Sequence, residues 1–118
     1  MTTLVLGASP DPTRYAHLAV RRLVAAGHEV LAIGKHIGMI GDTVITPSIP
    51  AGVPVDTITL YLSPANQRVW HEEIIGLRPR RVIFNPGAED PVFAEQLEAA
   101  GIEAMEACTL VLLSTGAY

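Results

Sequence analysis

A turn near the start of the chain carries residue types suited to binding an anionic group. Gly7-Ala8-Ser9-Pro10 follows an apolar run and leads, through Arg14, into a helical pattern. A glycine turn of this kind lets backbone N–H groups at a helix N-terminus, where the macrodipole is positive, face a phosphate. Arg14 adds a guanidinium that can bind the same group through two hydrogen bonds. We therefore predict a phosphate site at these five residues.

The turn lacks the motifs of the commonest nucleotide sites. Ser9 stands where the second glycine of G-x-G-x-x-G would be, and no G-x-x-x-x-G-K-[ST] sequence is present. The sequence therefore disfavours ordinary P-loop chemistry.

The end of the second predicted strand bears on the kind of nucleotide. A dinucleotide site usually has an acidic residue there, which bonds a ribose hydroxyl. This chain has Gly34-Lys35-His36 instead. A lysine with an imidazole beside it favours a phosphate on the ribose. The alternative is that Lys35 is a solvated loop charge and His36 a surface residue, and the sequence leaves both interpretations open.

Strands and helices alternate along the chain. Apolar residues at helical spacing predict a helix over 16–27. Ser63-Pro64 and Asp90-Pro91 place a capping residue before a proline, which predicts helices that end near residues 77 and 101. Strands are expected at 4–6, 29–33, 56–62, 82–84 and 102–105. The alternation predicts a Rossmann-like, doubly wound parallel sheet in a three-layer α/β/α arrangement, with residues 1–118 as a single domain.

Two segments do not fit this alternation. Residues 34–55 are rich in glycine and proline, and we expect a long functional loop with at most a short edge strand over 43–45. The apolar run 109–113 is too short to assign by periodicity.

Composition and charge argue against several kinds of partner and cofactor. The net charge is −4 and no Lys/Arg run exists, which argues against a large nucleic-acid or acidic-membrane surface. Cys108 is the only cysteine, so a disulfide framework or a thiolate metal cluster cannot form within one chain. The histidine spacing predicts no metal site. Without a leader or a long apolar run, we expect a cytoplasmic protein that has no membrane partner.

A set of short motifs carries a resemblance to a known family. The chain has GASPDPTR after the first strand, GK after the second, and TPSIP before the third, followed by YLSP, FNPGAED and EACTLVLLSTG. Together these resemble the small CoA-binding domain proteins, which are single Rossmann-like domains related to the CoA-binding module of acyl-CoA and succinyl-CoA synthetases. The resemblance covers nearly the whole chain. It implies a domain that binds coenzyme A or an acyl-CoA.

Carried over by position, the resemblance implies a place for each end of the ligand. The Gly7-Ala8-Ser9 turn and Arg14 would face the pyrophosphate, and Lys35 would lie toward the 3′-phosphate. Many relatives end the second strand in a P-V-N-P type sequence, whereas Gly34-Lys35 is closer to the synthetase module.

The resemblance also gives the third and fourth strand ends a role. Ser63 and Pro64 would border the ligand at the switch point, and the Asn85-Pro86-Gly87 segment would lie nearest the pantetheine and thiol. The same segment is good turn chemistry, which is a structural reason for its residues.

The chain offers no evident catalytic machinery. The related synthetases use a phosphorylated histidine and a grasp domain, neither of which fits in 118 residues. We therefore expect a binding module without independent catalytic activity, acting as a homo-oligomer or beside an enzyme partner. Two alternatives stay open. One is a small NADP- or other nucleotide-dependent enzyme, and the other is a Rossmann-like oligomerisation scaffold.

Overall fold

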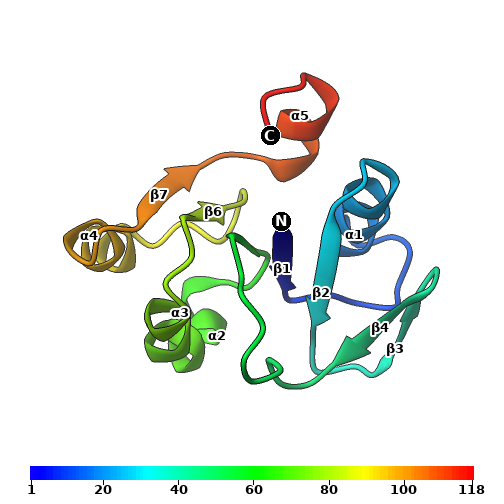
Figure 1. Ribbon diagram of the computed structural model, residues 1–118, viewed down its shortest axis with the longest axis horizontal. Helices are drawn as coiled ribbons and strands as arrows, with labels where there is room; N and C mark the ends of the chain where they lie inside the picture. The colour runs from blue at the N-terminus through cyan, green and yellow to red at the C-terminus, as the bar shows by residue number, and fades with distance from the viewer.

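A seven-stranded sheet with helices on both faces forms the protein (Figure 1). The computed structural model describes residues 1–118. The strands are β1 (Thr2–Leu6), β2 (Glu29–Ile33), β3 (Gly38–Ile40), β4 (Thr43–Thr46), β5 (Thr57–Leu60), β6 (Arg81–Phe84) and β7 (Glu103–Glu106). The helices are α1 (Tyr15–Ala25), α2 (Pro64–Gln67), the 3-10 turn η1 (Arg68–Trp70), α3 (His71–Leu77), α4 (Pro91–Ala99) and α5 (Thr109–Ser114).

The strand order confirms the predicted doubly wound sheet. The order is β3-β4-β2-β1-β5-β6-β7, and every neighbouring pair is parallel except β3 with β4. The chain first moves from β1 to β2 on one side, and later returns to β5 on the other side of β1. The switch point, where ligands of such sheets bind, therefore lies between β1 and β5.

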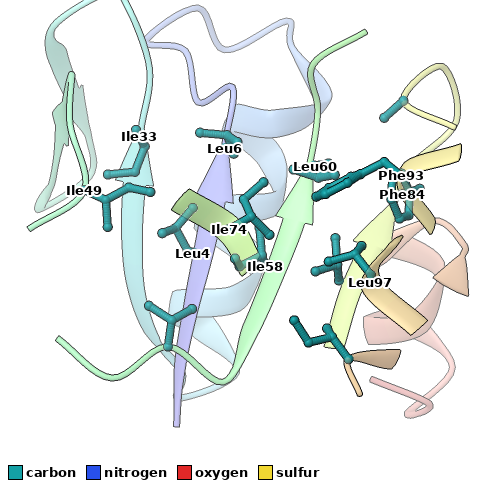
Figure 2. Close-up of a cluster of buried hydrophobic side chains, with 14 residues drawn as sticks. Leu4, Leu6, Ile33, Ile49, Ile58, Leu60, Ile74, Phe84, Phe93 and Leu97 are labelled. Carbon is teal, nitrogen blue, oxygen red and sulfur yellow. The ribbon is translucent and has the colours of Figure 1, made fainter. Parts of the chain in front are cut away.

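Two hydrophobic layers cover the sheet because side chains alternate along each strand. Leu4 and Leu6 face the cluster that contains Ile74 of α3 and Phe93 of α4 (Figure 2). Val5 faces the opposite cluster, which includes the buried side chains of α1. Helix α5 packs beside α1 on that second face (Figure 1). The three-layer arrangement is thus confirmed.

Strand register brings the strand ends to one level. Leu6, the last residue of β1, pairs with Ile33 of β2 and with Leu60 of β5. The turns that follow these strands therefore emerge side by side at the carboxyl edge of the sheet. The sequence predicts that the ligand binds at this edge.

The segment 34–55 contains more regular structure than predicted. A short strand at 43–45 was expected at the edge of the sheet. The strand is present as β4, but β3 pairs with it as an antiparallel hairpin, with Met39 opposite Val44, and β3 takes the edge. The hairpin depends on tertiary contacts: Gly34 N–H donates to Thr46 O at 3.0 Å, and Gly38 lies against Pro10. The predicted helix that starts at Pro64 is divided into α2, η1 and α3, and the unassigned run 109–113 is helical.

Candidate functional site

The glycine turn after β1 is tied to the end of β2. Gly7 has a φ of +100°, which favours glycine, and a Cβ there would lie 3.1 Å from the Leu62 side chain. The N–H groups of Gly7 and Ala8 both donate to Ile33 O, at 2.8 and 2.9 Å. These two amides are therefore occupied, and the contribution of Gly7 and Ala8 is to fix the path of the turn.

Unpaired amides lie at the end of the turn and at the start of α1. The N–H groups of Ser9, Tyr15, Ala16 and His17 make no hydrogen bond within the chain. Three of them form the first turn of α1, where the helix macrodipole is positive. Arg14 directly precedes this turn, and its side chain is 72% exposed. The donors suited to an anion thus come from Ser9 and α1.

The loop between the turn and α1 is held by its own side chains. Ser9 Oγ accepts from Asp11 N–H at 3.1 Å, and Asp11 Oδ1 accepts from both the N–H and the hydroxyl of Thr13, at 2.9 and 2.7 Å. These bonds from Thr13 hold the pKa of Asp11 below its usual value. Asp11 therefore carries a negative charge beside the unpaired amides, 3.9 Å from Arg14 Nε.

His17 is a buried residue of this site that the sequence did not reveal. Its side chain is 4% exposed, with Nδ1 3.0 Å from Ser9 O. Arg21 Nε donates to His17 Nε2 at 3.0 Å, so the ring proton lies on Nδ1 and is donated to Ser9 O. His17 thereby fixes the turn against α1. The spacing of His17 and Arg21 on one helical face was the only signal in the sequence.

The end of β2 touches the glycine turn directly. A Cβ on Gly34 would lie 2.1 Å from Ala8 O, so only glycine lets the two segments approach this closely. Lys35 and His36, which follow, are exposed and have no hydrogen-bond or ion-pair partner. Lys35 is the only lysine in the chain. A single unpaired ammonium group therefore stands beside the turn.

The third and fourth strand ends are joined by Gln67, which the sequence did not single out. Ser63 O accepts from the Gln67 N–H at 2.9 Å where α2 begins, next to Pro64. The fully buried Gln67 side chain donates through Nε2 to Leu62 O and to Ala88 O, each at 2.9 Å. This amide therefore fixes the spacing between the segments that follow β5 and β6.

Asn85 is engaged entirely within the protein. It is 1% exposed, and its Nδ2 donates to Thr59 Oγ1 at 2.6 Å and to Leu60 O at 2.9 Å. Its Oδ1 accepts from Thr109 N–H at 2.8 Å, which ties α5 to the sheet. Gly87, with a φ of +94°, is exposed in the following turn. Asn85 thus positions the strand ends, and Gly87 shapes their surface.

Tyr61 adds an unpaired hydroxyl near Thr59 and Thr109. Its Oη is buried and makes no hydrogen bond. Burial raises the pKa of Tyr61 to about 12, and the nearby hydroxyls of Thr109 and Thr59, which bond to each other at 2.8 Å, oppose this only in part. The phenol therefore stays protonated at neutral pH and keeps an unused donor.

Two cavities lie outside the predicted phosphate site. One of about 570 Å³ is at the amino edge of the sheet, between residues such as Met1, Glu29 and Arg80. Another of about 310 Å³ lies between η1, the start of α3 and α4. No group of three or more metal-ligating side chains is placed to hold an ion, and none of the helices combines the length and apolar composition needed to cross a bilayer.

The fold and this edge define a class of protein. A doubly wound sheet with a glycine turn and an unpaired helix N-terminus at its switch point is typical of nucleotide-binding α/β domains. The chain belongs to the CoA binding domain family, whose model matches residues 1–114. Membership of this family supports a CoA-binding role.

Solved structures share the fold across the whole chain. An uncharacterized protein known from a crystal structure is 44% identical, with 99% of this chain and 97% of that chain covered and a TM-score of 0.95. The cell-free ID.343 protein from Thermus thermophilus is 28% identical, with 99% and 90% covered and a TM-score of 0.87. A conserved hypothetical protein from Pyrococcus furiosus is 27% identical, with 93% and 96% covered and a TM-score of 0.75. Among curated proteins, none matches the chain.

Proposed function

We propose that the protein binds coenzyme A or an acyl-CoA as a small stand-alone binding module. The observation that carries the proposal is the row of unpaired amides at the start of α1, beside the exposed Arg14. These groups suit a pyrophosphate because N–H donors and a guanidinium stabilise negative charge without any proton transfer.

We further propose that Lys35 contacts the nucleoside end of the ligand. The residue has no partner within the chain, and the contact of Gly34 with Ala8 holds the segment before it against the phosphate turn. In this arrangement Lys35, with His36 beside it, binds the 3′-phosphate. Ser63, Pro64 and Gly87 border the pantetheine arm, and Asn85 positions that border.

Calorimetric titration with CoA, dephospho-CoA and NADP tests the proposal. We expect CoA to bind and the loss of its 3′-phosphate to weaken binding by about 1.5–3 kcal/mol, the value of one charge-assisted contact. Lys35→Ala should remove this difference, whereas Arg22→Ala, an exposed cation near the end of α1, should preserve it. Equal affinity for all three ligands, or none for any, would contradict the proposal. Preference for NADP would favour the nucleotide-dependent enzyme instead.

A second measurement uses the fact that Lys35 is the only lysine. Reductive methylation followed by mass spectrometry reports separately on Lys35 and on the amino group of Met1, which lies by the cavity at the opposite edge of the sheet. Bound CoA should slow modification of Lys35 and leave that of Met1 unchanged. Equal rates at Lys35 with and without CoA would place the ligand elsewhere.

A further inference from the structure

A groove on the face of the sheet covered by α3 and α4 lies next to the third and fourth strand ends. It encloses about 310 Å³ and is lined by Arg68, His71, Asp90, Val92, Phe93 and Gln96. We call it the η1–α4 groove. Nothing in the proposed contacts of the nucleotide uses these residues.

The groove is connected to the carboxyl edge of the sheet through Gln67. The Nε2 of this residue bonds Leu62 O and Ala88 O, the carbonyls that follow β5 and β6, and its Oε1 lies 3.2 Å from His71 Nε2. Because Nε2 must donate twice, Oε1 can only accept, so His71 Nε2 carries a proton that it donates. The Gln67 side chain therefore links the segments after β5 and β6 to His71 in the groove.

The floor of the groove is formed by a pair of stacked rings. The His71 ring stacks on Phe93 with 3.5 Å between ring centroids and 6° between planes. Phe93 in turn lies beside Phe84 and Leu60 in the core (Figure 2). Val92, at the start of α4, is 67% exposed on the groove's wall. Methylene groups of a ligand would cover this exposed apolar surface.

The two charged residues of the groove differ in whether they have a partner within the chain. Asp90 Oδ1 accepts from Phe93 N–H at 3.1 Å and caps α4. Arg68 has no hydrogen-bond or ion-pair partner, and its side chain is exposed. A guanidinium without a carboxylate partner is suited to bidentate binding of one. The groove thus offers the exposed apolar side chain of Val92, the ring of His71 and a cation that has no partner within the chain.

The proposed orientation of CoA brings its thiol end toward this groove. With the adenosine at β2 and the pyrophosphate at β1, the pantetheine arm must run in the other direction, across the ends of β5 and β6. Neighbouring strands are about 4.8 Å apart, so the end of β6 lies about 10 Å from that of β1. The extended arm is longer than this distance, so its thiol end can reach the segment after β6, where Asp90 and Val92 line the groove.

We propose that the η1–α4 groove binds the acyl group of an acyl-CoA, and that Arg68 selects short acyl groups that end in a carboxylate. This inference rests on the proposed CoA-binding function. The methylene groups lie on Val92 and on the half-buried His71 ring, and the terminal carboxylate pairs with Arg68.

Titration with CoA, glutaryl-CoA and pentanoyl-CoA tests this inference, since the two acyl groups differ only in the terminal carboxylate. We expect glutaryl-CoA to bind about tenfold more tightly than pentanoyl-CoA, as one charge-assisted contact predicts. Arg68→Gln should abolish the preference and leave affinity for CoA unchanged. Arg22→Gln is the matched control, because it removes an exposed arginine far from the groove and should preserve the preference.

A second variant should also weaken glutaryl-CoA binding, by adding a negative charge to the groove without removing the cation. Val92→Glu places a carboxylate at an exposed position of the groove and should weaken glutaryl-CoA binding while sparing CoA. Equal affinities for the two acyl-CoAs, or a preference that survives Arg68→Gln, would overturn the acyl site even if CoA binds well. Failure of CoA itself to bind would overturn the proposed function, and the acyl site with it.

Discussion

At the scale of single residues, the site combines unpaired donors with one fixed negative charge. Asp11 organises the loop before α1 by accepting two bonds from Thr13, yet it also lies close to the amides proposed to bind pyrophosphate. Its structural role needs an acceptor oxygen, not a charge. The two roles can therefore be separated by substitution.

Asp11→Asn should keep the bonds to Thr13 and strengthen CoA binding, because it removes a repulsive charge beside the phosphates. The gain, measured by calorimetry, should shrink as salt is raised, since exposed charges are screened. Asp11→Ala, which removes the acceptor as well, should weaken binding by loosening the loop. Weaker binding by Asp11→Asn than by the parent protein would show that the charge itself is needed.

His71 predicts a pH dependence of stability. Burial lowers its pKa below the usual 6.5, Arg68 lowers it further, and Asp90 opposes them. The unfolded chain then binds the proton more readily than the folded protein, so this residue's contribution rises as pH increases up to about 6.5 and is constant above. Urea unfolding of wild type and His71→Gln from about pH 5 to pH 8 should show the difference between their slopes only below this value. If the free energies of unfolding of the two proteins changed in parallel over the whole pH range, this prediction would be contradicted.

At the scale of elements, the close contact between the turn after β1 and the end of β2 holds the site together. Ile33 O binds the turn's two amides, and Gly34 makes room for Ala8 O. The contact joins the turn and the end of β2, which the sequence predicted as two separate parts of the site. A substitution at Gly34 measures how much this contact contributes to the free energy of unfolding.

Gly34→Ala should lower the free energy of unfolding by about 1–3 kcal/mol, because its Cβ would clash with backbone that cannot move freely. Gly76→Ala is the matched control. Gly76 lies in α3 with no atom within 4 Å of a Cβ, so alanine there should stabilise the protein by about 0.5–1 kcal/mol. Urea unfolding measures both. A neutral Gly34→Ala variant would show that the turn can shift without cost.

The sequence predicted the main elements well where local signals and tertiary structure agree. The strand 29–33 has the predicted bounds, and Pro91 begins α4 as expected from its cap. The β3 strand was missed because its glycine-rich sequence gains its conformation from pairing with β4. The glycine turn was located from the sequence, but the hydrogen-bond partners of its amides were not. Ile33 O and Ser9 O are backbone atoms, and no side-chain pattern reports which donors they accept from.

At the scale of the whole molecule, Tyr118 fastens the end of α5 across the amino half of the sheet. Its hydroxyl bonds Thr3 Oγ1 at 2.5 Å, and Arg81 lies over its ring with Cζ 4.5 Å from the centroid. The His28 ring meets the Tyr118 ring edge-on at 4.9 Å. One side chain thus contacts β1, β6 and the residue before β2, at the edge opposite the proposed ligand.

Tyr118→Phe should lower the free energy of unfolding by about 1 kcal/mol, because it removes a partly buried hydrogen bond and keeps the ring. Tyr118→Ala should cost more, since the contact with Arg81 is lost as well. CoA affinity should be unchanged in both. Tyr15→Phe, at an exposed tyrosine without such a bond, should leave stability unaltered. A loss of CoA affinity in Tyr118→Phe would mean that the two edges of the sheet are energetically coupled.

The contact of Gly34 with Ala8 O also restricts which cofactors this scaffold can be redesigned to accept. Dinucleotide enzymes recognise the ribose hydroxyls through a carboxylate at the end of the second strand. Aspartate at position 34 would drive its Cβ into a carbonyl oxygen 2.1 Å away, so that single exchange is blocked by shape and not by charge. Conversion to an NAD-binding domain would have to begin by rebuilding the turn after β1, and only then exchange the cation at Lys35.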